Sequence, residues 1–459
     1  MCVRIRIILE DDQGIVQADD EIARLDRWGL STATLGLTLA EAKSLLEQVQ
    51  RRMAAQQTEA CLEAARRCPH CDRRRPLKGH NALVVRTLFG TLSLPSPRLY
   101  RCACEGSRRS SFSPMASALP ERTTPELCYL QTKWAGLMSY GQTVGLLSEV
   151  LPLDRRLNTR SLRRRLHHVA ERLEADLEPE RVLGEDRAPG APGTWPRPEL
   201  PLTVGIDGGF VHAREGSDRK AGWFEVIAGK SIPAAGASKC FAFVQRHDDK
   251  PRRRLHAILA AQGLAPNQQI TFISDGGESV RGVQRDLHRE AEHLLDWFHV
   301  TMRITVMRQM AKSLTRDGAA DIAAEVDRAL ERVKWFLWHG NVYKAGETLD
   351  DLGLEIDCAD DTPAGAKLAQ AVAEFEGYIR GNQDSVPNYG DRWRNGERIS
   401  SGFAESTINQ VVSKRMVKSQ QMRWTPRGAH QLLQIRTKVL DGDLRAAFQR
   451  WHPDMTAAA

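Results

Sequence analysis

The sequence has no continuous run of about 18 apolar residues, the length that a membrane-spanning helix needs. Its first residues, MCVRIRIILEDDQG, alternate as a strand does and hold neither the apolar core nor the cleavage site of a secretory signal peptide. These absences predict a chain that is neither exported nor anchored by helices. Nine cysteines are an odd number, and without an export signal close cysteine pairs favour metal binding over disulfides. We therefore expect a cytoplasmic protein.

Positive charge is concentrated in three segments, although the overall composition is ordinary. The 459 residues are too many for one hydrophobic core, and 41% hydrophobic with 27% charged residues is typical of globular domains. Lys and Arg outnumber acids by eleven to two in residues 66–110, by seven to two in 154–172 and by nine to two in 410–450. Separate basic segments in a chain of net charge +7 indicate an extended nucleic-acid-binding protein. Ordinary solvated surface is the alternative.

The N-terminal region predicts a strand over residues 3–10 and then a long helix. Thr38 and Glu41 form a capping box, and apolar residues recur at helical spacing after it. The helix can serve as an arm for self-association or can pack on the next domain.

Two cysteine pairs flank a predicted β-hairpin whose strands, VVRTLFG and TLSLPSPRLYR, meet at Gly90. Four thiolates at the ends of a hairpin give tetrahedral zinc coordination and replace a core that is too small to fold alone. The pattern predicts a zinc ribbon, although the second pair has one intervening residue where two are usual. Cys61, His70 and His80 are spare ligands nearby. The four predicted ligands are Cys68, Cys71, Cys102 and Cys104.

Residues 124–180 predict three helices, the last opened by a capping Asn158 or Thr159. A short helix, a turn and an arginine-rich helix fit a helix-turn-helix, in which Arg160, Arg163 and Arg164 face phosphates or base edges. The alternative is an amphipathic helix with a solvated face.

A proline-rich linker, residues 184–201, separates this part from a domain with another pattern. Three predicted strands, a helix, a strand, a helix and a strand follow, and this order is that of a ribonuclease-H-like sheet. Residues from His299 to about Arg380 then predict a helical insertion. The fold class is therefore multidomain α+β: a zinc ribbon and helix-turn-helix precede a ribonuclease-H-like α/β catalytic domain with an all-helical insertion.

Two apolar strands in this domain end in an aspartate followed by two glycines, GIDGG with Asp207 and ISDGG with Asp275. A single Asp-Gly is usually a turn, but two copies after buried strands place two carboxylates at one sheet edge. The glycines let a phosphate approach. Two such carboxylates and a third from a helix can hold two Mg²⁺ ions about 4 Å apart, as phosphodiester chemistry requires.

Glu405 is the preferred third carboxylate, because the run after it combines helical periodicity with basic charge. Glu397 and the acids Glu355, Asp357, Asp360 and Asp361, expected in a loop, are rivals. The basic run predicts contacts to the DNA backbone. Its candidate DNA-binding residues are Lys414, Arg415, Lys418, Arg423 and Trp424.

Asp296 and His299 form a D-x-x-H pattern at a predicted strand end. His299 can contact the scissile phosphate or carry a proton, or Asp296 can simply orient it against the sheet. Trp297 and Trp424 can stack on an unpaired base, although a core position is commoner for tryptophan.

These motifs resemble insertion-sequence transposases of the DDE type, in the ISKra group, over most of the chain. The carriers are CPHC with RTLFGTLSLPSPRLYRC, then GIDGG, FISDGG, LDWFH and, most specific, ESTINQVVSKRMVKSQQMRWTPRGAHQLLQIRT. The D-x-x-H pattern is also similar to Mutator-like transposases.

The resemblance implies a catalytic triad of Asp207, Asp275 and Glu405, with His299 as an accessory residue. It implies two Mg²⁺ or Mn²⁺ ions at the triad, structural Zn²⁺, and double-stranded DNA as partner, both the element's terminal inverted repeats and a target. A homodimer or larger assembly pairs two ends, cleaves and transfers strands, and works at the bacterial nucleoid. A metal-dependent nuclease or resolvase on the same fold, and a catalytically silent regulator, are the alternatives.

The expected domains follow from these boundaries. They are an N-terminal strand and helical arm (1–65), the zinc ribbon (66–110), the helical DNA-binding domain (111–183), the linker (184–201), the first part of the catalytic core (202–300), the helical insertion (301–395) and the last part of the core with a C-terminal tail (396–459).

Overall fold

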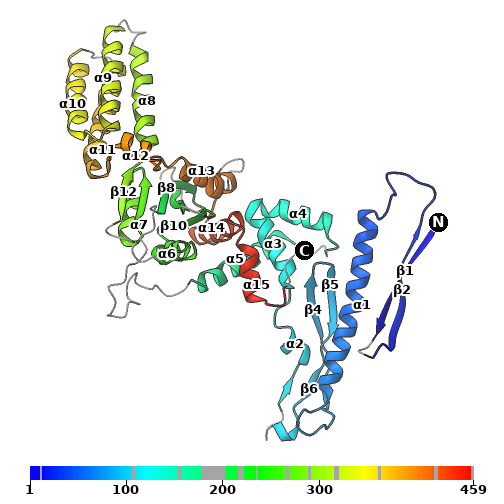
Figure 1. The fold of residues 1–459 in the computed structure, drawn as a ribbon. Helices are drawn as coiled ribbons and strands as arrows, with labels where there is room; N and C mark the ends of the chain where they lie inside the picture. The colour runs from blue at the N-terminus through cyan, green and yellow to red at the C-terminus, as the bar shows by residue number, and fades with distance from the viewer. Residues whose placement is uncertain are drawn as a thin grey trace. The chain divides into compact units, whose positions relative to one another are not determined.

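A computed structural model gives the fold of the chain, which is mixed α+β (Figure 1). It divides into two compact units, Met1–Val169 with Asp443–Ala459, and Ala170–Gly442. The expected linker 184–201 lies outside the described residues. The structure describes residues 1–10, 13–105, 110–153, 157–177, 202–214, 222–233, 236–264, 268–287, 291–314, 320–359, 363–417 and 422–455.

The first unit begins with an antiparallel hairpin of β1 (Cys2–Glu10) and β2 (Val16–Asp26), followed by helix α1 (Leu39–Arg66). The strand and helix expected here are confirmed, and Thr38 and Glu41 make both hydrogen bonds of the capping box. The second half of α1 packs on the next hairpin, since Ala54 is buried against its strands.

The cysteine-bearing segment holds a hairpin of β4 (Ala82–Thr87) and β5 (Gly90–Pro95) and a three-stranded sheet in the order β3 (Leu77–Gly79), β6 (Arg98–Tyr100), β7 (Ser111–Phe112). The second strand expected from the sequence is therefore two strands. Pro95 and Pro97 interrupt it because a proline has no N–H to donate to a ladder. Gly90 occupies the tight turn with φ +124°.

Helices complete the first unit. The three expected ones are confirmed as α3 (Pro125–Leu137), α4 (Tyr140–Val150) and α5 (Thr159–Ala175), after a short α2 (Pro114–Ala118). The Asn158 side chain accepts a hydrogen bond from the Ser161 N–H (2.9 Å) and caps α5. A further helix, α15 (Leu444–Trp451), packs on α3, where Phe448 meets the ring of Tyr129. The C-terminal segment thus belongs to the first unit.

A five-stranded sheet, in the order β10-β9-β8-β11-β12, forms the centre of the second unit. Strands β8 (Leu202–His212), β9 (Trp223–Ile232) and β10 (Lys239–Val244) are antiparallel, whereas β11 (Ile270–Ser274) and β12 (Glu292–Leu295) run parallel to β8. Helices α6 (Pro251–Ala261) and α7 (Glu278–Leu287) connect the later strands. The expected order of strands and helices is confirmed.

Helices cover both faces of this sheet. On one face, alternate residues of β8 pack against α6 and α7, and the members of this core are Leu202, Val204, Ile206, Leu255, Leu259, Val280 and Val283. On the other face lie α13 (Gly402–Ile408) and α14 (Pro426–Leu440), joined by the π-helix η4 (Asn409–Val417). Alternation along β8 therefore turns Asp207, next to Ile206, toward the α13 face.

Four helices between β12 and α13 form a bundle with its own apolar core. They are α8 (Trp297–Leu314), α9 (Ala320–Trp338), α10 (Val342–Ala359) and α11 (Pro363–Gly381), and they lie side by side in Figure 1. The short η3 (Gln383–Ser385) and α12 (Tyr389–Arg394) lead back to the sheet. Within the described ranges, no helix has the length and apolar character that crossing a membrane requires.

Candidate active site and metal centres

Strand pairing places the two predicted aspartates side by side on neighbouring strands. Only β11 stops there as expected, because β8 continues past Asp207 to His212 in its pairing with β9. In the parallel pair β8–β11, Gly205 lies opposite Ile273. Two residues further along, Asp207 and Asp275 are at the same level. Each carboxylate also accepts a hydrogen bond from a following glycine, Asp207 from the Gly208 N–H (2.8 Å) and Asp275 from the Gly277 N–H (2.9 Å).

A glycine in β8 lets the third carboxylate approach. A Cβ atom on Gly205 would lie 2.4 Å from the ring of Phe403 and 3.0 Å from Ala404, both in helix α13. This close packing places the first turn of α13 on the sheet, and Glu405 stands in that turn with an exposed side chain. The expectation that a glutamate opens a late helix packed on the sheet is confirmed in position.

The other three predicted catalytic residues influence the charge of Asp207. Burial and, next, the negative charge of Asp275 raise the pKa of Asp207 to about 6. The Gly208 N–H and His299 oppose the rise, while Glu405 adds to it. Carboxylate oxygens are the ligands that Mg²⁺ prefers. Among the described residues, however, Asp207, Asp275 and Glu405 are not a group whose ligand atoms all lie within 4.8 Å of one another.

His299 lies in the first turn of α8 and not at a strand end, because β12 stops at Leu295. Its Nε2 is 3.7 Å from Oδ2 of Asp296. The Asp296 carboxylate is fully buried and accepts hydrogen bonds from the Phe298 N–H (2.9 Å) and from Ser401, the residue before α13. The role of Ser401 was not foreseen from the sequence. The late helix was expected to open at Glu405, whereas it begins at Gly402, so no sequence signal pointed to Ser401.

The other acids considered for the third carboxylate lie in different surroundings. Glu397 accepts a hydrogen bond from Arg392 (2.7 Å), which also pairs with Glu292. Glu355 lies in helix α10 and not in a loop, because helical packing continues through Ile356. Asp357 belongs to the same helix, whereas Asp360 and Asp361 fall outside the described residues.

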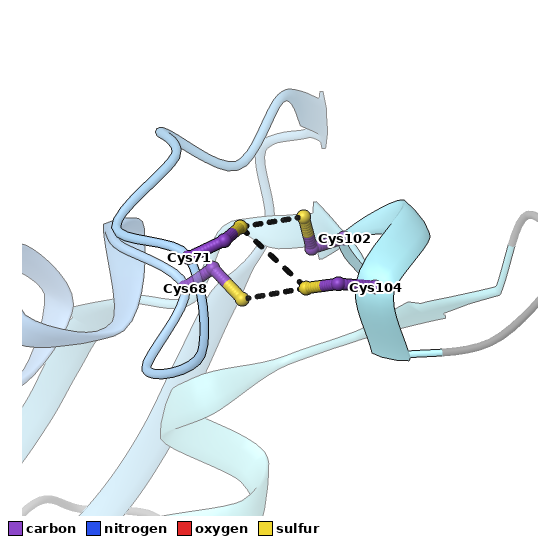
Figure 2. Close-up of side chains that lie close together, drawn as sticks. All are labelled: Cys68, Cys71, Cys102 and Cys104. Atoms are coloured by element: carbon purple, nitrogen blue, oxygen red, sulfur yellow. Dashed lines mark hydrogen bonds between the residues drawn. The ribbon is translucent and has the colours of Figure 1, made fainter.

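The four predicted zinc ligands form one cluster (Figure 2). Their sulfur atoms all lie within 4.8 Å of one another, with Cys68 to Cys104 and Cys71 to Cys102 at 3.4 Å. The short helical turn η1 (Ala103–Glu105) directs both sulfurs of the tight second pair to the cluster, so one intervening residue suffices. Cys61, His70 and His80 are not members. Four thiols at this spacing can bind structural zinc.

Hydrogen bonds around the cysteine cluster favour thiolate at Cys102. The N–H of Cys104, followed by the sulfurs of Cys71 and Cys104, lowers the pKa of Cys102 to about 7. Glu105 accepts a hydrogen bond from the Cys102 N–H (2.9 Å) and pairs with the nearly buried Arg75. This second layer of contacts orients the cysteine backbone, as outer residues do at metal sites.

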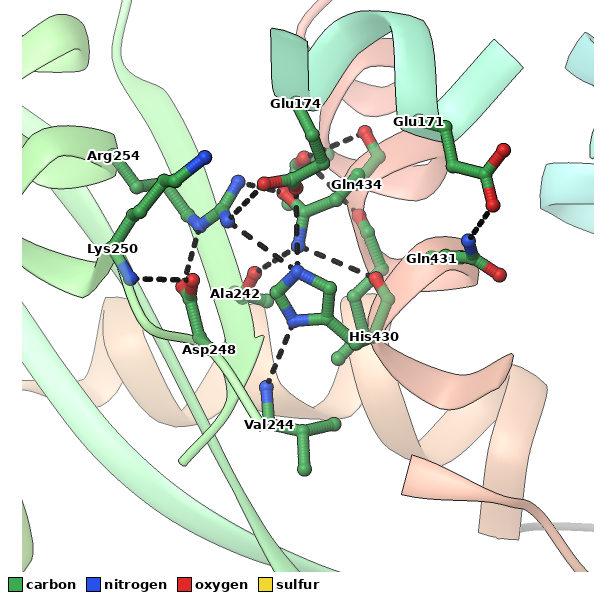
Figure 3. A network of polar contacts seen from close by, with 12 residues as sticks. Glu171, Glu174, Ala242, Val244, Asp248, Lys250, Arg254, His430, Gln431 and Gln434 are labelled. Carbon is green, nitrogen blue, oxygen red and sulfur yellow. Dashed lines mark hydrogen bonds and ion pairs between the residues drawn. The ribbon is translucent and has the colours of Figure 1, made fainter. Parts of the chain in front are cut away.

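A buried polar network joins α5, α6 and α14 to the end of β10 (Figure 3). Glu174, Asp248 and His430 have their ligand atoms within 4.8 Å of one another, a spacing at which they can hold a metal. Arg254 already supplies a positive charge there, donating to Asp248 (3.0 Å) and Glu174 (3.0 Å). Burial opposes ionisation of Glu174, yet hydrogen bonds from His430 and Arg254 lower its pKa to about 2. No sequence pattern predicted this network, since its members come from distant segments of the chain.

The predicted DNA-binding arginines of α5 are all exposed. Arg160, Arg163 and Arg164 face solvent, whereas the neighbouring Arg165 is largely buried and donates to Thr123 (3.0 Å). The connection from α4 to α5 spans 151–158, which is longer than the turn of about three or four residues in a helix-turn-helix.

The basic run after Glu405 is exposed only in part. Lys414 and Arg423 are exposed, but Arg415 is 6% exposed and lies against the Trp424 ring at 5.4 Å. The prediction that Arg415 and Trp424 contact DNA is therefore wrong. The expected α-helical faces do not apply, because residues 409–417 form a π-helix, in which hydrogen bonds span five residues. Lys418 lies outside the described residues.

The second candidate for base stacking packs against the helical bundle. The ring centroid of Trp297 lies 5.1 Å from that of Trp338 and 4.7 Å from that of Tyr389, and its partly buried side chain contacts the core of the bundle. Trp424 is thus buried, whereas Trp297 keeps part of its surface exposed.

Comparison with protein-family models gave no match, and comparison with curated proteins found no similar sequence. The argument for function therefore rests on the geometry of these sites.

Proposed function

We propose that this chain is a DNA transposase with a ribonuclease-H-like catalytic core. Three observations support the proposal: Asp207 and Asp275 lie at the same level of neighbouring strands, the helix that carries Glu405 packs on β8, and the pKa of Asp207 is raised to about 6. The strand order, with three antiparallel strands followed by two parallel ones, is the order expected of such a core. The charge of Asp275 disfavours the ionised form of Asp207, and perturbed carboxyl groups of this kind are concentrated at functional sites.

Two Mg²⁺ ions bound to these carboxylates would activate the attacking oxygen and stabilise the leaving oxygen of a phosphodiester. Asp207 must lose its proton to become a metal ligand. A cation bound in place of that proton would remove the repulsion between the carboxylates of Asp207 and Asp275. His299 stands close enough to influence the charge of Asp207 and can carry a proton to or from the reacting oxygens. Because one phosphodiester replaces another in strand transfer, no external energy source is needed.

The exposed arginines of α5 and the zinc ribbon would bind the terminal inverted repeats of an insertion sequence. Positive side chains on an exposed helix face release counterions from DNA on binding, which makes the affinity depend on salt. We propose a homodimer or larger assembly on DNA, since a mobile element has two ends to join, and we place the protein in the bacterial cytoplasm at the nucleoid.

A reaction with purified protein, Mg²⁺ or Mn²⁺ and labelled DNA carrying the element's own ends tests the proposal. Cleavage at the ends with joined products is expected, and Asp275→Ala should abolish both. Glu397→Gln is the matched control, because this acid pairs with Arg392 and should be dispensable for the chemistry. Cleavage without joining would replace the transposase by a nuclease or resolvase. Binding without cleavage would replace it by a regulator.

A further inference from the structure

The Asp296 carboxylate is fully buried and makes its contacts with the segment before α13. Oδ1 accepts hydrogen bonds from the N–H of Ser401 (3.0 Å) and of Phe298 (2.9 Å), and Oδ2 accepts one from the Ser401 hydroxyl. A buried carboxylate is stable only when such donors surround it. The main partner of Asp296 is therefore Ser401, which lies 105 residues later in the chain.

Ser401 occupies the N-cap position of α13 but makes no capping hydrogen bond with its side chain. Serine at this position normally accepts a hydrogen bond from the first turn of the helix. Here the hydroxyl donates to Asp296 instead, while the Ser401 carbonyl accepts from the Glu405 N–H (3.1 Å). One helical turn thus connects Asp296 to Glu405.

The backbone at Asp296 also holds the strand that ends in Asp275. The Asp296 N–H donates to the carbonyl of Ser274 (2.9 Å), and the Trp297 N–H donates to the carbonyl of Ile399 (3.1 Å). The end of β11, the start of α8 and the approach to α13 therefore meet at one residue. In contrast, the 3.7 Å between Asp296 Oδ2 and His299 Nε2 exceeds the length of a hydrogen bond.

We propose that Asp296 is a positioning residue that holds Glu405 at the proposed metal site through Ser401. This role takes the place of the expected one, in which Asp296 orients His299. The inference rests on the proposed function in one respect, that Glu405 is a metal ligand. The structural part of the inference is that the contact between Asp296 and Ser401 fixes the start of α13. This part does not depend on the proposed function.

Ser401→Ala tests the proposal, because it removes only the hydroxyl that Asp296 accepts. Mn²⁺ binding without DNA, followed by electron paramagnetic resonance, should weaken about 10-fold, the effect typical of losing an outer contact at a metal site. Amide hydrogen exchange of Gly402–Ile408 should accelerate. Ser401→Thr keeps the hydroxyl and should restore both, and Ser400→Ala is the matched control, with the same change one residue earlier.

A double-mutant comparison separates positioning from general loss of structure. In a Glu405→Gln background, Ser401→Ala should weaken Mn²⁺ binding no further, whereas exchange of α13 should still accelerate. Unchanged Mn²⁺ affinity and unchanged exchange in Ser401→Ala would overturn the inference, as would an undiminished effect on affinity in the Glu405→Gln background. If the unsubstituted protein bound no Mn²⁺, the proposed function would fail. Amide hydrogen exchange of α13 in Ser401→Ala would still decide whether the contact with Ser401 fixes the start of this helix.

Discussion

Replacing Asp207 by asparagine should stabilise the protein while it abolishes cleavage. Burial, and next the charge of Asp275, hold the pKa of Asp207 at about 6 against an ordinary 3.8. That difference corresponds to about 3 kcal/mol of unfolding free energy, and solvent screening of the exposed Glu405 charge reduces the expected gain to about 2 kcal/mol. Asparagine has nearly the shape of the protonated acid and carries no charge to repel.

The sign of this effect depends on pH. A carboxyl whose folded pKa is raised binds a proton more tightly in the folded state, so stability falls as pH rises from about 4 to about 6 and stays lower above that range. The increase in unfolding free energy caused by Asp207→Asn should therefore be near zero at about pH 4 and should reach its full value above about pH 6.5. Added Mg²⁺ should reduce the difference in unfolding free energy between Asp207→Asn and the unsubstituted protein at high pH, because a bound cation relieves the same repulsion in the unsubstituted protein.

Urea unfolding without added divalent ions, at several pH values, measures this difference, with the exposed Asp351→Asn as the control. Equal gains at low and high pH, or a loss of stability at high pH, would refute the reasoning. Either result would mean that burial and the charge of Asp275 do not raise the pKa of Asp207.

Three further substitutions have outcomes that the structure fixes. Gly205→Ala should lower the unfolding free energy by about 1–3 kcal/mol, seen in thermal unfolding, and should also reduce cleavage, because the new Cβ pushes away the helix that carries Glu405. Cys71→Ser should reduce bound zinc below one ion per chain by elemental analysis; a full ion retained would remove this cysteine from the ligand set. Arg254→Met should cost about 3–5 kcal/mol in urea unfolding, because it leaves two carboxylates buried without their cation; rescue by a divalent ion would show a metal site there.

Local signals predicted the elements well. The capping box at Thr38 and Glu41 predicted the start of a helix, and the two Asp-Gly-Gly patterns predicted that Asp207 and Asp275 lie on neighbouring strands. The cysteine pairs predicted a cluster of four thiols. Each signal is a short motif of a few residues, so it can be recognised without knowing how the chain folds.

Predictions about exposure were less successful. Arg415 and Trp424 carry the residue types of a DNA contact, yet both are buried and lie against each other. Trp297 is partly buried against the core of the bundle. Which face of a helix meets solvent depends on what packs against it, and composition does not record this.

The sequence by itself determined where helix α1 begins, the order of strands and helices in the second unit and which four cysteines gather, because short-range periodicity, capping chemistry and cysteine spacing encode these features. Only the tertiary structure decided that Ser401 binds Asp296, that Arg254 lies between Glu174 and Asp248, and that the glycine at 205 lets α13 approach β8. These contacts join segments tens to hundreds of residues apart. The packing of the whole chain selects such pairings, and no local pattern announces them.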